Sequence, residues 1–189
     1  MSWNLPFLNP AVNVNRLPDK QIKQLNPKLR WQIMEPTFIG YATFYLARNN
    51  LPMISKEMGQ APGYSKGQIG NILAATTISY GIGKFFMGPW SDRSNLRYFI
   101  PLAFLLTAFC NFPFATVNSY PIHLAPWGVN GLVQSMGWAP CGRSLGHWYG
   151  IRERGTKFTF WNVAQNLGGG VTGFAVGYLA AKLGWHSAF

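Results

Sequence analysis

An arginine stands inside an otherwise apolar run at residues 39–50, IGYATFYLARNN. Tyr41, Tyr45 and Arg48 are spaced i, i+4 and i+7, so on a helix they share one face. An arginine within a membrane-length segment is costly and normally faces a protein interior or a water-filled cavity. Because a guanidinium binds anions through charge-assisted hydrogen bonds, this face is a candidate anion-binding surface.

Two further basic residues, Lys84 and Arg143, lie within apolar segments and have no acid three or four positions away. The chain holds only five acids, and of these only Glu35 is next to a predicted membrane segment. An anionic substrate would supply the missing partner for Arg48 and Lys84. Pairing with acids of other helices, or snorkelling to the interface, is the alternative. Arg143 lies near the end of its segment, which favours a role in a loop network.

Polar aromatic residues accompany these cations. Tyr80 precedes Lys84 by one helical turn, and Trp161 and Gln165 are spaced i, i+4 on a later segment. Such side chains can hydrogen-bond a polar ligand, although helix packing alone explains them equally well.

Two other patterns predict structural roles. Glycines recur every fourth residue at Gly169, Gly173 and Gly177, which favours close helix approach. The end of the second apolar segment carries a loop motif whose charges are expected to pair across helix ends or to lie in a solvated turn: Gly88, Asp92, Arg93 and Arg97.

The long apolar segments that carry these residues predict an all-α membrane protein. Only 11% of the 189 residues are charged, against about 25% in an average soluble domain. The mean hydropathy of +0.04 is low for a membrane protein, partly because residues 1–30 are polar. Those residues are expected to form an aqueous tail in which prolines break any long helix. The bundle at 31–189 is expected to contain five membrane helices and the start of a sixth, the five being 31–54, 67–90, 98–117, 122–148 and 158–183.

The basic residues predict the orientation of these helices. The tail and the loops at 91–97 and 149–157 hold ten of the 16 Lys and Arg residues, and the alternate loops hold three. Because Lys and Arg concentrate in cytoplasmic loops, the N-terminus is predicted to be cytoplasmic. This alternation with apolar segments also disfavours nucleic-acid binding as the reason for the net charge of +11.

No motif points to an enzyme, a metal or a cofactor. The histidines His123, His147 and His186 are far apart in sequence, and Cys110 and Cys141 have no close neighbour at metal-ligand spacing. Nucleophile-elbow and phosphate-binding-loop motifs are missing, which disfavours hydrolysis and ATP-driven transport by this chain.

Four runs resemble the organophosphate:phosphate antiporters of the major facilitator superfamily, which include glycerol-3-phosphate and hexose-6-phosphate transporters. They read GYATFYLARNN, SYGIGKFFMGPWSDRSN, SMGWAPCGR and WNVAQNLGGG, within a similarity that extends from about residue 29 to the end. The resemblance implies the N-terminal half of a twelve-helix inner-membrane protein, favoured as a monomer. By alternating access it would exchange an organic phosphate for inorganic phosphate between two six-helix bundles, the C-terminal one being absent here.

The resemblance also implies roles for individual residues. Arg48 matches one of two arginines that clamp phosphate, and Lys84 matches a basic residue near the site. The matching aromatic residues line the cavity: Tyr41, Tyr45, Tyr80, Trp138 and Trp161. Gln165 stands where glycerol-phosphate members have a histidine, so a titrating group is lost there. Asn49 stands where a lysine is frequent. A transporter-like sensor that binds a sugar phosphate without moving it is the alternative function.

Overall fold

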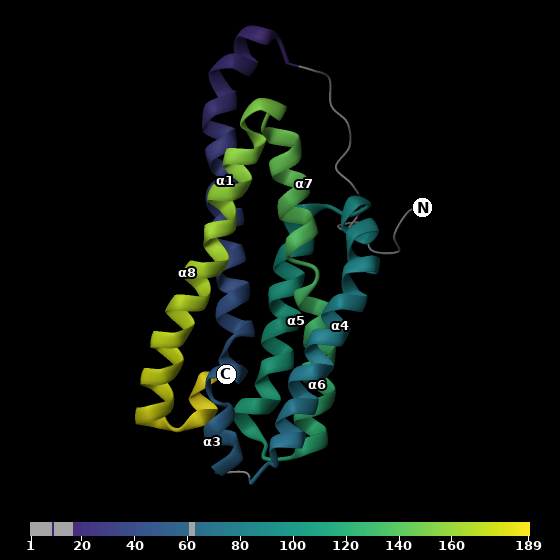
Figure 1. Cartoon of the computed structure of the whole chain (residues 1–189). Coiled ribbons are helices and arrows are strands. Elements are labelled where there is room, and N and C mark those ends of the chain that lie inside the picture. Colours follow the sequence, from purple (N-terminus) through teal and green to yellow (C-terminus); the bar gives the residue numbers. More distant parts are fainter. Residues whose placement is uncertain (1–8, 10–16, 61–62) are drawn as a thin grey trace.

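The computed structural model describes residue 9 and residues 17–60 and 63–189, and all regular structure in this part of the chain is helical. Figure 1 shows the long helices running roughly side by side. In chain order the elements are α1 (Asp19–Arg48), α2 (Asn50–Met53), α3 (Ser55–Gln60), α4 (Lys66–Asp92), α5 (Leu96–Thr116), α6 (Tyr120–Gln134), α7 (Trp138–Trp148), α8 (Ile151–Leu183) and the 3-10 turn η2 (Trp185–Ala188). The prediction of an all-α bundle is confirmed.

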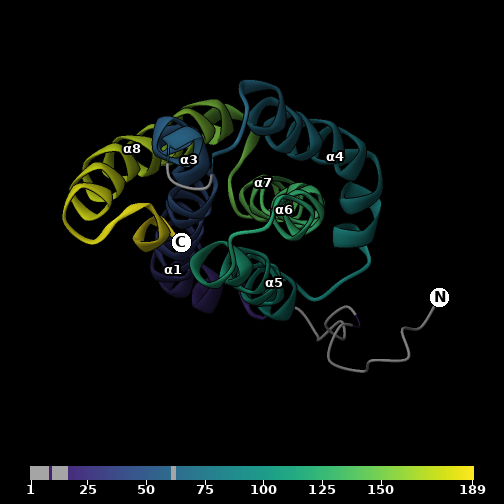
Figure 2. The same ribbon diagram turned by 90° about the horizontal axis from the view of Figure 1, so that it is seen from below.

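Two groups of helices make up the bundle. The first pairs α1 with α8, and the second places α6 between α4 and α5, as Figure 2 shows from below. The shorter α7 contacts α1, α4 and α8 and so joins the two groups. We call the end where α1, α5 and α8 begin the upper end, because it is uppermost in Figure 1.

The packing of α1 on α7 and α8 places the tyrosine face of α1 inside the molecule. Met34 and Tyr41 of α1 are buried in one cluster with Cys141 and Leu145 of α7 and Trp161 of α8. Burying such large side chains removes apolar surface from water or lipid and fixes the relative position of the three helices.

The helix ends follow local rules. At the start of α4, Ser65 forms a capping box with Gln68, each side chain bonding the other's backbone N–H. The Asn95 side chain accepts a hydrogen bond from the Arg97 N–H at the start of α5. These two caps fix the starts of α4 and α5, and the cap of α5 lies in the short turn that follows α4.

The first expected boundary is wrong. The polar segment at 1–30 does not stay free of long helix, because α1 begins at Asp19 and runs through Pro27 and Pro36. A proline removes one helical hydrogen bond and bends a helix without necessarily ending it. The α1 ribbon curves at its upper end in Figure 1. Helix α1 ends at Arg48, so the expected segment 31–54 is divided between α1 and α2.

Two later boundaries also differ from expectation. The expected helix 122–148 is divided by a turn at residues 135–137, and this places Pro140 in the first turn of α7, where its missing N–H needs no helical partner. The expected start of the last helix at residue 158 is seven residues late, because α8 begins at Ile151. The Glu153 side chain accepts a hydrogen bond from the Gly150 N–H and caps this start.

Membrane-spanning character differs among the helices. Within the described residues, α5 is the one helix that combines sufficient length with a high mean hydropathy, 1.6. The longer helices α1, α4 and α8 carry charged residues along their length. Some of these charges belong to the candidate site.

Candidate functional site

The site begins with a stack of aromatic rings between α1 and α8. The rings of Tyr41 and Trp161 are stacked with centroids 4.3 Å apart, and Tyr45 meets Tyr41 edge-on at 5.4 Å. The Trp161 indole N–H donates to the Thr37 carbonyl oxygen at 3.1 Å, which satisfies its buried donor. Tyr41 and Trp161 are almost fully buried, so they form the rigid base of the site.

Two cations from different helices contact one ring at the edge of this stack. The Arg48 guanidinium carbon lies 4.0 Å from the centroid of the Tyr80 ring and 5.9 Å from that of Tyr45. The Lys84 ammonium lies 4.6 Å from the Tyr80 centroid. Both distances to Tyr80 are within the range of cation–π attraction. The structure therefore brings Arg48 of α1 and Lys84 of α4 together around Tyr80.

Gln165 joins the site through Tyr45. The Tyr45 hydroxyl donates to Gln165 Oε1 at 3.1 Å, which links α1 to α8 beside the cations. An uncharged amide can accept this bond and still offer its NH₂ group to a ligand oxygen.

Gly168 explains how α1 and α8 approach so closely. A Cβ atom at this position would lie 2.3 Å from the Ala42 carbonyl oxygen and 2.9 Å from Tyr45 Cβ. The Thr172 hydroxyl, one turn later, bonds the carbonyl oxygens of Gly168 and Tyr45. The expected glycine face is therefore displaced by one residue. A Cβ at Gly169 would meet only the Asn49 amide at 3.2 Å, and one at Gly177 would meet nothing within 4 Å.

Trp138 is separate from this group. It is the first residue of α7 and is about half exposed. In the described part of the chain, no ring, cation or hydrogen-bond contact joins its side chain to the other seven predicted site residues. The structure thus brings together Arg48, Lys84, Tyr41, Tyr45, Tyr80, Trp161 and Gln165.

Arg143 has partners of another kind. Its guanidinium lies 3.6 Å from the Asp92 carboxylate and donates to the Ser94 carbonyl oxygen at 3.1 Å. It therefore connects α7 with the turn between α4 and α5, in agreement with the loop role favoured by the sequence. Of the predicted loop motif, Asp92 makes this ion pair, while Arg97 contributes its backbone N–H to the cap of α5.

The sequence did not predict a second polar cluster at the upper end. Arg30 of α1 donates to the Glu153 carboxylate of α8, and its guanidinium lies 4.3 Å from the Tyr149 ring centroid. The Tyr149 hydroxyl in turn donates to the Arg30 carbonyl oxygen at 3.0 Å. The unrecognised signal was Glu153, an isolated acid within the basic run IRERGTK.

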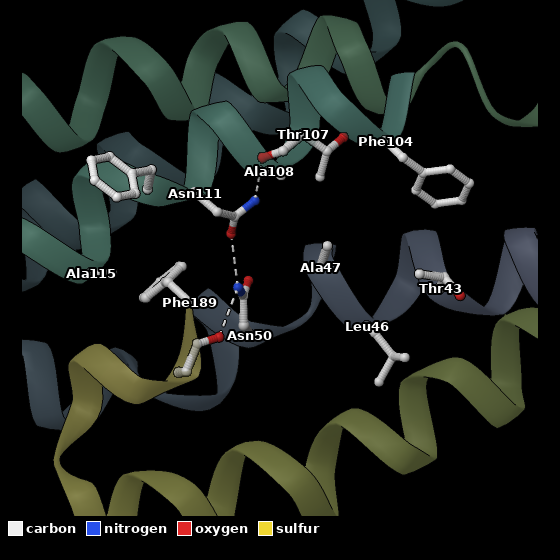
Figure 3. A pocket seen from close by; sticks show the side chains of 12 residues that line it. Thr43, Leu46, Ala47, Asn50, Phe104, Thr107, Ala108, Asn111, Ala115 and Phe189 are labelled. Atoms are coloured by element: carbon white, nitrogen blue, oxygen red, sulfur yellow. Dashed lines mark hydrogen bonds between the residues drawn. The ribbon is translucent and has the colours of Figure 1, made fainter. Parts of the chain in front are cut away.

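A pocket of about 420 Å³ lies on another side of α1, between α1, α5 and η2 (Figure 3). The Asn50 amide donates there to Asn111 Oδ1 at 3.0 Å and to the Ala188 carbonyl oxygen at 3.1 Å. All twelve lining residues are uncharged, so this pocket provides no cation for an anionic ligand. The face around Tyr80 remains the candidate anion site. The described residues also contain no group of three or more His, Cys, Asp and Glu residues able to hold a metal.

Comparison with known proteins agrees with the all-α membrane fold. The family model of the Major Facilitator Superfamily matches residues 37–189. The chain is similar to the glycerol-3-phosphate transporter of Bacillus subtilis (strain 168), with 40% identity over 98% of the chain and 43% of that relative.

Two further relatives are named for other functions. The chain is 33% identical to a probable hexose phosphate transport protein of Chlamydia trachomatis, over 98% of the chain and 41% of the relative. It is 31% identical to the membrane sensor protein UhpC of Escherichia coli, over 97% of the chain and 42% of the relative. The chain thus spans about two fifths of the length of these relatives, and by the match over residues 37–189 it belongs to the major facilitator superfamily.

Proposed function

We propose that this chain is the N-terminal part of a multi-pass inner-membrane carrier that exchanges an organic phosphate for inorganic phosphate by alternating access. Glycerol 3-phosphate or a sugar phosphate is the organic substrate. The N-terminus is cytoplasmic, and a second bundle outside this chain completes the site. The observation that supports this proposal most directly is the pair of cations, Arg48 and Lys84, gathered around Tyr80.

The chemistry of the site suits a phosphate group. A phosphate dianion requires positive charge and hydrogen-bond donors, and Arg48 supplies both, in a planar fork that matches two phosphate oxygens. Lys84 adds a second charge, and the Gln165 amide offers a donor near Tyr45. Among the described residues, no acid forms an ion pair with Arg48 or Lys84, so their charges remain available to an anion.

Each helix has a role in this proposal. Tyr41 and Trp161 fix α1 against α8 beneath the site. The second phosphate-binding arginine belongs to the other bundle. Rocking of the two bundles then exposes the bound phosphate alternately to either side of the membrane. Trp138, which is exposed near the start of α7, is proposed to line the cavity only when the second bundle is present.

Counterflow in liposomes tests the proposal. The full-length protein is reconstituted with internal inorganic phosphate, and uptake of external labelled phosphate or glycerol 3-phosphate is followed. We expect Arg48→Lys to abolish exchange, because an ammonium cannot replace the bidentate guanidinium. The matched control is Arg143→Lys, which changes an arginine engaged by Asp92 and Ser94. Unchanged exchange in Arg48→Lys would refute the proposed role of Arg48.

A sensor that binds the ligand without moving it is the second candidate function, and the similarity to a membrane sensor protein supports it. Binding and transport are separated by measuring both on the same preparation. Counterflow by the wild-type protein would exclude a pure sensor. Phosphate binding without any counterflow would favour the sensor over the carrier.

A further inference from the structure

The first turns of α1 extend beyond the rest of the bundle. At 1.5 Å per residue, the 30 residues of α1 span about 45 Å, whereas a bilayer's hydrocarbon layer is about 30 Å thick. Figure 1 shows this excess at the upper end, above the turn where α8 begins. Part of α1 therefore lies at or beyond the membrane surface if the remainder crosses the bilayer.

This extension carries a strong positive charge. Residues 17–31 and 150–157 together contain seven Lys and Arg residues and two acids. Lys20, Lys23 and Lys28 are exposed. One of the two acids, Glu153, is already engaged by Arg30. The surface thus keeps a net positive charge after its internal ion pair is counted.

The same turns also present apolar side chains. Ile22, Leu25 and Leu29 are spaced i, i+3 and i+7 and share one helix face. Leu25 is 43% exposed and Leu29 is 37% exposed. At 100° per residue, the three exposed lysines fall away from this leucine face. A short amphipathic stretch with lysines on one side suits the boundary between headgroups and acyl chains.

A shallow pocket continues this surface between α1 and α8. It has a volume of about 220 Å³, and its lining includes Trp31 and Lys157 together with the ion pair of Arg30 and Glu153. Trp31 is 60% exposed, and tryptophan concentrates at the headgroup level of membranes. The Lys157 ammonium and an indole on one concave wall match the phosphate and glycerol portions of a phospholipid.

We propose that the first turns of α1 and the start of α8 bind anionic phospholipid headgroups at the bilayer surface. A soluble phosphate would use the lysines but would leave the leucine face without a partner. An anionic leaflet accounts for both, since it offers negative charge directly above apolar chains. The surface is distinct from the site around Tyr80, so the proposal holds whichever anion is transported.

A fluorescent reporter at Leu25→Cys tests this binding in the full-length protein. Cys110 and Cys141 are buried, which favours labelling of the new thiol. In phosphatidylcholine vesicles that also contain phosphatidylglycerol, we expect the emission to shift to the blue as the label enters the interface. The shift is expected to disappear in pure phosphatidylcholine and to weaken in about 1 M salt, where the Debye length falls to about 3 Å.

Charge removal provides the matched comparison. Each lysine near an anionic membrane contributes about 1 kcal/mol, or about fivefold, so removing three at once is expected to lower the lipid-bound equilibrium constant on the order of 100-fold. The test variant is Lys20→Gln/Lys23→Gln/Lys28→Gln. The control is Lys56→Gln/Lys66→Gln/Lys182→Gln, which removes the same charge from the opposite end of the bundle.

Three results would overturn the proposal. The first is an equal blue shift in vesicles with and without phosphatidylglycerol, which would place the segment against the rest of the protein. The second is an equal loss in both triple variants. The third is a shift produced by soluble glycerol phosphate in pure phosphatidylcholine, which would assign the surface to a soluble anion.

Discussion

The cations on these helices are of two kinds, which differ in the group that they contact: an aromatic ring or a carboxylate. Arg48 and Lys84 meet the ring of Tyr80 at 4.0 and 4.6 Å. Arg30 and Arg143 meet the carboxylates of Glu153 and Asp92. The first pair lies beside the buried aromatic stack, and the second pair lies where α1 meets the first turn of α8 and where α7 meets the end of α4.

The difference lies in whether the positive charge is already used. A carboxylate neutralises an arginine and makes strong hydrogen bonds with it. An aromatic ring stabilises a cation by only about 0.5–2 kcal/mol and leaves its net charge unchanged. Tyr80 can therefore hold Arg48 and Lys84 in place and yield them to an incoming dianion. Arg30 and Arg143 instead fasten helices together.

The largest effect is expected from giving Arg48 and Lys84 a carboxylate partner in place of the aromatic ring. Tyr80→Glu would place a carboxylate next to Arg48 and Lys84. A charge pair about 4 Å apart at an effective dielectric of about 20 is worth about 4 kcal/mol, so phosphate affinity should fall on the order of 100-fold or more. Equilibrium binding of labelled phosphate to the full-length protein measures this. The control is Tyr80→Gln, because glutamine has nearly the shape of glutamate but no charge. An equal loss of phosphate affinity in both variants would contradict the neutralisation argument.

A smaller effect is expected from separating α1 and α8, the two helices that carry the stacked rings of Tyr41 and Trp161. Gly168→Ala would insert a methyl group 2.3 Å from the Ala42 carbonyl oxygen. Overpacking of this kind typically costs about 1–3 kcal/mol. We expect a lower melting temperature and a weaker Tyr45–Gln165 contact, measured by thermal unfolding and phosphate binding. Gly170→Ala has open space at its Cβ and should leave both unchanged. Equal stability of the two variants would show that the close approach is unimportant.

Removing the ring without adding charge is expected to have a modest effect. Tyr80→Leu keeps an apolar side chain but loses the cation–π contacts with Arg48 and Lys84. Since such contacts are worth about 0.5–2 kcal/mol, phosphate affinity should fall about 2- to 30-fold as the cations lose their fixed positions. Tyr80→Phe keeps the ring and should restore most of the affinity. If Tyr80→Phe loses as much phosphate affinity as Tyr80→Leu, the hydroxyl group and not the ring is the important feature.

The sequence predicted the all-α bundle and the shared face of Tyr41, Tyr45 and Arg48, because helical periodicity fixes which residues lie on one side. It also placed Tyr80 and Lys84 on the same helix face, one turn apart. It did not reveal that Tyr80 lies between cations of two helices, since this depends on how the bundle places α1 relative to α4. The sequence did not predict the start of α1, because prolines usually break helices, whereas Pro27 and Pro36 are accommodated within this one.

Gly168 shows the same limit at a finer scale. The repeated spacing of Gly169, Gly173 and Gly177 predicted a contact face, and the run GGG leaves its exact register open. The observed contact uses Gly168 and Thr172, because the direction of α8 relative to α1 is set by Trp161 and its neighbours in the buried cluster. Spacing alone identifies a small-residue face but does not identify the partner helix.

The smallest expected effect concerns a cation that is already paired. The hydrogen bond from Arg30 holds the pKa of Glu153, which lies outside the proposed membrane-spanning segments, below its ordinary value of 4.5. A carboxyl group with a lowered pKa in the folded state stabilises the protein above the unfolded pKa. That contribution is lost as the pH falls through the folded pKa.

Glu153→Gln should therefore lower the melting temperature slightly at neutral pH, and this difference from the wild-type protein should shrink below about pH 4.5. Thermal unfolding of the full-length protein across this pH range measures the change. Arg30→Gln should lower the melting temperature with the same pH dependence. The double variant should lower it little further than either single variant, because both substitutions act on one ion pair. A difference that stays constant with pH would show that the charge of Glu153 is not its stabilising feature, since a glutamine oxygen can still accept the hydrogen bond from the Gly150 N–H.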